Sequence, residues 1–154
     1  MYGSLSWQCR VGGYERFFRT AAGLDVDKND LKRHSEFVND KLYDLLVIAR
    51  AAAKANLRDV VEPWDLPITK GLQESIHRFR SLDEEIELRP ILEQIAARPP
   101  LEITLSDDTS ARLPLIAGGL SLALAEAFTI LEPDVRNPGP EEWARASRIF
   151  DLLL

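Results

Sequence analysis

Cysteine and histidine are scarce in this sequence of 154 residues, which contains one cysteine, Cys9, and two histidines, His34 and His77. A single cysteine cannot form a disulfide within the chain, and this fits a reducing compartment. Protein zinc sites use several cysteine, histidine or carboxylate ligands at standard spacings, and no such set can be written here. We therefore expect no metal site and no internal disulfide.

Long apolar runs are also absent. No uninterrupted run of about 18 apolar residues occurs, so we expect no membrane-spanning helix and no membrane partner. The first residues, MYGSLSWQCRVGGY, lack the apolar core behind a basic start that a secretory signal peptide needs. We expect a cytoplasmic protein, with residues 1–13 as a flexible tail and residues 14–154 as a single domain.

Basic residues are fewer than acidic residues in this chain. The chain has 19 lysines and arginines against 25 aspartates and glutamates, a net charge of −6. Residues 1–81 carry 13 basic and 11 acidic residues, whereas residues 82–154 carry 6 and 14. Because neutralised phosphates supply most of the affinity for nucleic acid, this balance disfavours a protein that wraps DNA.

The spacing of apolar residues predicts helices. Between Asp30 and Asn56 apolar residues recur at helical steps, which predicts one long helix with Asp27 and Asp30 near its start. A short helix is expected before it, at residues 14–22, and Gly23 is a suitable stop. After the long helix, residues 57–63 are expected to form a loop with a brief extended piece.

A third helix is expected to start at Asp65, which would cap it, with Pro67 in its first turn. Its apolar stripe consists of Leu72, Ile76 and Phe79. The order of elements is then short helix, long helix, short helix.

This order repeats in the second half of the chain. We expect a short helix at residues 88–97, an extended piece at 101–105, a long helix from Asp108 to about Glu132, and a last helix from Pro140. The second long helix is expected to present one apolar face: Leu113, Ile116, Leu120, Ala123, Leu124, Ala127 and Leu131.

Pro114 and the pair Gly118-Gly119 fall inside this second long helix. The proline indicates either a later start or a kink. Each glycine costs about 1 kcal/mol relative to alanine in a helix. The glycines are either simply tolerated, or they allow close approach where the two long helices cross.

Several stretches carry a resemblance to a known family. They are RTAAGLDVDKNDLKR (19–33), KLYDLL (41–46), DLPI (65–68), KGLQE (70–74) and FDLLL (150–154). With them the chain resembles a small bacterial family of histone-fold doublets, described as domain of unknown function 1931. The resemblance implies an all-α fold of two tandem histone-fold units (14–81 and 82–154), packed as an intramolecular pseudodimer, and it implies no activity.

Arg58 and Asp65, seven positions apart, match a pair that fixes the loop before the third helix in histone folds. A guanidinium can donate two hydrogen bonds to a carboxylate that also accepts from backbone N–H groups. The alternative is two unrelated surface charges. In the second half the counterpart is degraded, because Arg136 is followed by Glu141 and Glu142.

Histones that wrap DNA carry basic residues where the first loop of one unit meets the second loop of its partner. Here the matching loops, 24–30 and 132–136, are acidic, and the other end would join Asp59 and Glu62 with Glu102, Asp107 and Asp108. Contact through another face would use Arg10 and the following candidates: Arg16, Arg19, Lys28, Lys32, Arg33 and Lys41. The alternative for these residues is an ordinary solvated face.

Patterns typical of catalysis are weak. Glu74 and His77 have the spacing used in di-iron bundles, but the second copy that such a site needs is missing. Gly12-Gly13 lacks the lysine of a phosphate-binding loop, and Cys9 has no histidine near it in the sequence. The acidic cluster Asp83-Glu84-Glu85-Glu87 is interpreted as a solvated junction between the halves.

Of the remaining residues, we interpret His34 as a hydrogen-bonded residue at the core boundary, and Trp64 and Trp143 as core or interface anchors. We expect no catalytic residue, no cofactor and no enzymatic activity. The leading hypothesis is a non-catalytic interaction module that acts through a protein partner or self-association. The alternative is a DNA-binding protein associated with the nucleoid.

Overall fold

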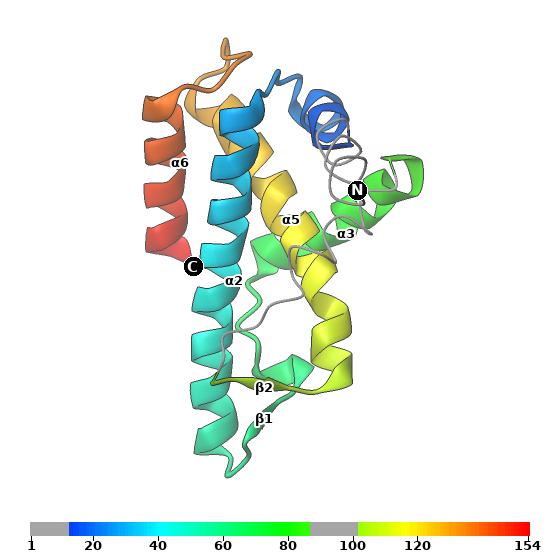
Figure 1. Cartoon of the computed structure of the whole chain (residues 1–154), viewed down its shortest axis with the longest axis vertical. Helices are drawn as coiled ribbons and strands as arrows, with labels where there is room; N and C mark the ends of the chain where they lie inside the picture. Colours follow the sequence, from blue (N-terminus) through cyan, green and yellow to red (C-terminus); the bar gives the residue numbers. More distant parts are fainter. Residues whose placement is uncertain (1–12, 87–101) are drawn as a thin grey trace, which may run out of the picture.

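The computed structural model describes residues 13–86 and 102–154 (Figure 1). A helix at residues 13–22 is followed by α2 (Lys28–Ala55), β1 (Val60–Val61), the 3₁₀ turn η1 (Pro63–Asp65) and α3 (Lys70–Ile86). After the gap come β2 (Thr104–Leu105), α5 (Asp107–Leu131) and α6 (Pro140–Leu153). The predicted all-α class is confirmed. The helix expected at 88–97, Cys9 and the tail before residue 13 lie outside the described residues.

The start of α2 is determined by two aspartates. The Asp27 carboxylate accepts a hydrogen bond from Asp30 N at 2.9 Å, and the Asp30 carboxylate accepts one from Asp27 N at 3.0 Å. Together they satisfy N–H groups that have no partner in the first turn. The preceding helix ends at Gly23, whose φ of +64° is the left-handed conformation expected there.

The end of α2 has a leucine where glycine is usual. Leu57 has a φ of +60°, with its N–H donating to Lys54 O and that of Arg58 donating to Ala53 O. This hydrogen-bond pattern is a Schellman motif. Leu57 is 96% exposed, so its side chain gains little from packing.

Replacing Leu57 with glycine should therefore raise the free energy of unfolding by about 1 kcal/mol, because glycine adopts the left-handed conformation without steric cost. Urea denaturation measures this change. Asn56→Gly is the matched control, since Asn56 has a φ of −101° and gains nothing there. Equal effects of the two substitutions would contradict the explanation.

The start of α3 corrects a prediction. Asp65 does not cap this helix, and Pro67 lies in the segment before it rather than in its first turn. The carboxylate of Asp65 is already occupied within the loop, and Thr69 Oγ1 accepts from Leu72 N at 3.2 Å instead. Leu72, Ile76 and Phe79 are buried as predicted. Since α3 continues to Ile86, the division expected after Ser81 falls inside a helix.

Helix α5 is the central helix of the fold. It begins at Asp107, where Ser106 Oγ accepts from Thr109 N, and Pro114 lies within it. Leu113, Ile116, Leu120 and Leu124 of the predicted face are buried, and since residues 113–122 are all buried, the burial extends beyond that face. By length and composition α5 could cross a membrane, and 67% of its most apolar window is buried inside the molecule.

The glycine pair of α5 allows a close helix contact, but with α3 rather than with the other long helix. A Cβ atom on Gly119 would lie 2.5 Å from Ile76 Cγ1 and 3.0 Å from Ile76 N. A Cβ atom on Gly118 would overlap the ring of Phe79. Of the two interpretations, close approach is therefore correct, with a different partner.

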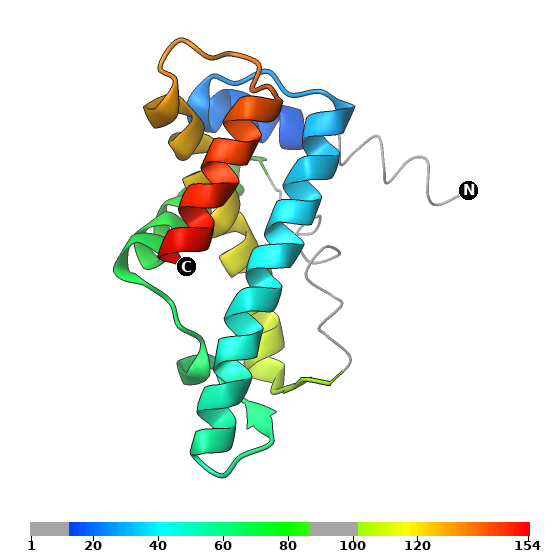
Figure 2. The ribbon, with the colours of Figure 1, turned by 90° about the vertical axis from the view of Figure 1, so that its left-hand side faces the viewer.

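Helices α2, α3 and α6 pack around α5, and α3 crosses it (Figures 1 and 2). Helices α2 and α5 run in opposite directions, and α6 lies beside α2. At one end of the molecule β1 pairs in parallel with β2, joining Val60 to Thr104 and Val61 to Leu105. At the opposite end Asp25 N donates to Arg136 O at 2.6 Å. We call these the strand end (residues 57–66 and 102–108) and the Asp25 end (residues 23–27 and 132–139).

Candidate functional site

The strand end is organised by Arg58 and Asp65, which the structure brings together. Arg58 Nη1 and Nη2 each donate to a different oxygen of Asp65 at 2.7 Å, and Asp65 Oδ2 also accepts from Glu62 N at 2.8 Å. The hydrogen bonds from Arg58 lower the pKa of Asp65 to about 2. The Arg58 guanidinium also lies 5.8 Å from the ring centroid of Trp64, which is 75% exposed and so is not a core anchor.

Replacing Arg58 with alanine should lower the melting temperature by several degrees, because the buried carboxylate of Asp65 loses its charged partner. Circular dichroism measures the change. The pKa of Asp65 is depressed in the folded state, so the pair stabilises the fold above the unfolded pKa of 3.8 and loses this effect as pH falls towards 2.

The difference between wild type and Arg58→Ala should accordingly shrink over that acidic range. Lys70→Ala, which removes an ammonium that is 91% exposed, is the control for loss of a positive charge. An unchanged melting temperature of Arg58→Ala at neutral pH would contradict a structural role for the pair.

Carboxylates predominate at both ends of the molecule. At the strand end Asp59, Glu102, Asp107 and Asp108 are exposed, and the guanidinium of Arg58 is engaged by Asp65. At the Asp25 end the following acidic side chains are exposed: Asp25, Asp27, Glu132 and Asp134. A phosphate backbone approaching either end would therefore meet like charge.

The predicted nucleic-acid residues differ in exposure and pairing. Arg16, Arg19 and Lys32 are exposed, and Arg19 also lies 3.8 Å from Asp25 in an ion pair. Lys28 is exposed at the start of α2, and Arg33 is half-buried. Four of these candidates are thus exposed, of which Arg19 is in an ion pair, and Arg33 is half-buried.

Lys41 corrects the prediction most clearly. Its side chain is only 4% exposed, and its ammonium donates to Asp151 of α6 and, at 3.5 Å, to Asp44. A buried and paired ammonium is not available to a phosphate. Lys41 therefore joins α2 to α6 instead of contacting nucleic acid.

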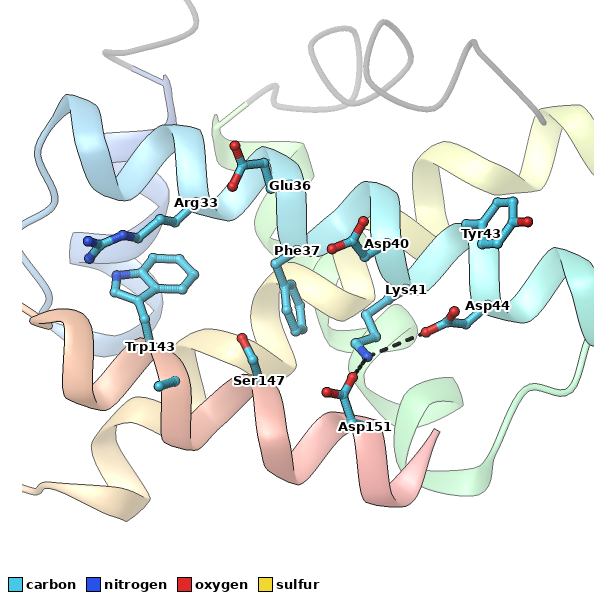
Figure 3. A pocket seen from close by; sticks show the side chains of 11 residues that line it. Arg33, Glu36, Phe37, Asp40, Lys41, Tyr43, Asp44, Trp143, Ser147 and Asp151 are labelled. Atoms are coloured by element: carbon cyan, nitrogen blue, oxygen red, sulfur yellow. Dashed lines mark hydrogen bonds and ion pairs between the residues drawn. The ribbon is translucent and has the colours of Figure 1, made fainter. Parts of the chain in front are cut away.

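A groove of about 440 Å³ runs between α2 and α6, and Lys41 and Asp151 lie in it (Figure 3). Trp143 is buried at one end of this groove, where its Nε1 donates to Asp30 Oδ1 at 2.9 Å. Burial raises the pKa of Asp30 above its usual value. Side chains of both charge signs line the groove: Arg33, Glu36, Asp40, Lys41, Asp44 and Asp151.

His34 lies in the core, deeper than the predicted boundary position. It is completely buried, its Nε2 lies 2.7 Å from Ser121 Oγ, and burial lowers its pKa to about 3. Ser121 Oγ donates its proton to Ala117 O, so His34 Nε2 carries the hydrogen and donates to Ser121. Its Nδ1 has no hydrogen-bond partner among the described residues. We interpret His34 as a neutral structural residue.

The described part of the chain contains no group of three or more His, Cys, Asp and Glu side chains arranged to hold a metal ion. His77 is exposed on α3, near Glu74 on the same helix. Sequence reasoning missed the polar contacts between distant elements, among them His34–Ser121, Lys41–Asp151, Asp30–Trp143 and Arg78–Glu126. Ser121, a polar residue within the apolar run of α5, was the one available signal.

Comparison with known proteins finds one matching family model and relatives that are uncharacterized. A family model described as "Domain of unknown function (DUF1931)" matches residues 14–151. Two uncharacterized proteins of Aquifex aeolicus are 28% and 29% identical, covering 99% and 78% of this chain and 90% and 77% of their own lengths.

Two crystal structures are similar over 94% of this chain, each with a TM-score of 0.81. One is a protein from Thermus thermophilus that is 51% identical and covered to 97%. The other is a protein from Aquifex aeolicus that is 27% identical and covered to 95%. The agreement extends over nearly the whole fold.

Proposed function

The chain belongs to the DUF1931 family, a domain of unknown function, and from this premise we propose that it is a histone-like pseudodimer acting as a non-catalytic protein-interaction module. In this proposal the helix at 13–22, α2 and α3 form one unit, and α5 and α6 belong to the other. The protein works in the cytoplasm through a protein partner or self-association. No cofactor is part of the proposal.

The crossed pairing of loops supports the pseudodimer. β1, which follows the first long helix, pairs with β2, which precedes the second long helix. At the other end the segment before the first long helix bonds to the segment after the second, through Asp25 N and Arg136 O. Each unit thus places its first loop against the second loop of the other, as two histone-fold units do when they dimerise.

The negative charge of these two ends is the observation that favours a protein partner over DNA. Carboxylates surround both loop pairs, and Arg58, the arginine at the strand end, is held in two hydrogen bonds by Asp65. Such ends would repel a phosphate backbone. A protein surface, in contrast, can pair with carboxylates through its own lysines and arginines.

A gel-shift series with duplex DNA at increasing salt tests this choice. We expect no binding near physiological ionic strength, because phosphate binding requires a cluster of free cations. Binding with a steep salt dependence that is lost in Lys32→Ala/Arg33→Ala would overturn the proposal. The control is Lys70→Ala, which removes an exposed cation on α3.

The alternative is a nucleoid-associated protein that binds DNA through another face. Arg16 is exposed on the helix at 13–22, and Lys32 is exposed on the first turns of α2. These exposed cations favour the DNA-binding alternative. Affinity capture from native cells, with and without nuclease, distinguishes the two. Partners retained after nuclease treatment support protein interaction, whereas partners lost with the nucleic acid support the alternative.

A further inference from the structure

The middle of α2 exposes a stripe of apolar side chains. Tyr43, Val47 and Ile48 are 53%, 43% and 47% exposed, and Ala51 is exposed as well. Residues 43, 47 and 51 are spaced by four positions, and residue 48 lies beside 47 and 51, so all four share one face of the helix. Adjoining apolar side chains on a protein surface mark an interaction site. We call these four residues the α2 stripe.

Charged residues flank the α2 stripe with opposite signs at its two ends. Asp40 and Asp44 lie on the N-terminal side, and Arg50 and Lys54 lie on the C-terminal side. Their positions are symmetric about Val47, because 40 and 54 are each seven residues away and 44 and 50 are each three. The face is therefore complementary to itself when it is reversed.

We propose that two copies of this chain associate through the α2 stripe, with their α2 helices antiparallel and the two-fold axis at Val47. This pairing places Asp40 against Lys54 of the second copy and Asp44 against Arg50. It also places Tyr43 opposite Ala51, a large side chain against a small one. A parallel pairing would set like charges against each other, so the charge pattern selects the antiparallel one.

The charge pattern also favours a second copy of this chain over another protein as the partner. In a two-fold interface both copies contribute the same patch, so that patch must be complementary to itself. Asp44 and Arg50 already have partners within the chain, Lys41 and Glu102, each at 3.5 Å. Asp40 and Lys54 are exposed and form no ion pair among the described residues. The Asp40–Lys54 contact is accordingly the best position for a charge exchange.

This inference names the partner in the proposed interaction function and rests on it. Light scattering and sedimentation equilibrium of the full chain should show a dimer at micromolar concentration. Val47→Asp should give a monomer, since it places two carboxylates at the axis. Val47 is 43% exposed, so the fold tolerates this change, and an unchanged circular dichroism spectrum checks it.

The charge exchange is the sharper test. Lys54→Asp and Asp40→Lys should each weaken the dimer about tenfold or more, because each sets like charges together twice across the axis. The double variant Asp40→Lys/Lys54→Asp should restore wild-type association. Lys70→Asp, on α3 and outside the α2 stripe, makes the same charge change as Lys54→Asp and should leave the dimer unchanged.

A wild-type monomer at high micromolar concentration would overturn the dimer. So would a dimer that is insensitive to Val47→Asp, or a double variant that fails to recover. A monomer that still retains a nuclease-resistant protein partner would leave the interaction function intact with a different partner. A monomer that instead binds DNA with a steep salt dependence would overturn both proposals.

Discussion

Replacing Gly119 with alanine should destabilise the protein by about 2 kcal/mol or more. The new Cβ atom would lie 2.5 Å from Ile76 Cγ1 and 3.0 Å and 3.1 Å from the backbone N and Cα of Ile76. A side chain can rotate away from such a contact, but the backbone of a packed helix cannot. Helices α3 and α5 would have to move apart, and buried contacts between them would be lost. Urea denaturation measures the change.

Gly71→Ala is the matched control, because it adds the same methyl group to a glycine of α3. Nothing lies within 4 Å of the Cβ position of Gly71, so alanine should be neutral or stabilising by up to about 1 kcal/mol. Gly118→Ala should resemble Gly119→Ala, since the overlapping ring of Phe79 is completely buried. A Gly119→Ala protein as stable as wild type would show that α3 and α5 are not in close contact.

Acidification from pH 7 to pH 5 should cost the fold about 2 kcal/mol through His34 alone. Burial holds the pKa of His34 at about 3 in the folded state, against 6.5 in the unfolded chain. Below pH 6.5 the imidazole of His34 is therefore protonated in the unfolded state but stays neutral in the folded state. The stability contributed by a neutral His34 is present above pH 6.5 and is lost progressively as pH falls towards 3.

Denaturation curves of wild type and His34→Phe at several pH values between 7 and 5 measure this effect. Phenylalanine keeps an aromatic ring against Tyr14 and Phe18, which contact His34 edge to face, and it removes the titrating group. We expect the variant to be less stable at pH 7, because Ser121 loses its donor, and to show a much flatter pH dependence. His77→Phe, at an exposed position, is the control for replacing a histidine with phenylalanine. Equal slopes for wild type and His34→Phe would contradict the burial of a neutral imidazole.

The sequence by itself determined the features that depend on neighbours in the chain. Apolar spacing gave the long helix now seen as α2, and Asp27 and Gly23 marked helix ends because their side chains or backbones satisfy groups a few residues away. Arg58 and Asp65 belong to the same class, since they are seven positions apart in one loop. Within that loop, local reasoning still assigned Asp65 to the wrong helix start, because Glu62 N and Arg58 compete for the same carboxylate.

Only the tertiary structure decided the role of residues whose partners are distant in the chain. Lys41 bonds to Asp151 across 110 residues, His34 to Ser121 across 87, and Trp143 to Asp30 across 113. On an isolated α2, Lys41 has the features of a surface cation and His34 those of a boundary residue. Packing α2 against α5 and α6 removes water from both, and the partners that these helices supply then determine charge state and burial. The periodicity of one helix carries no information about which polar groups another helix will bring to it.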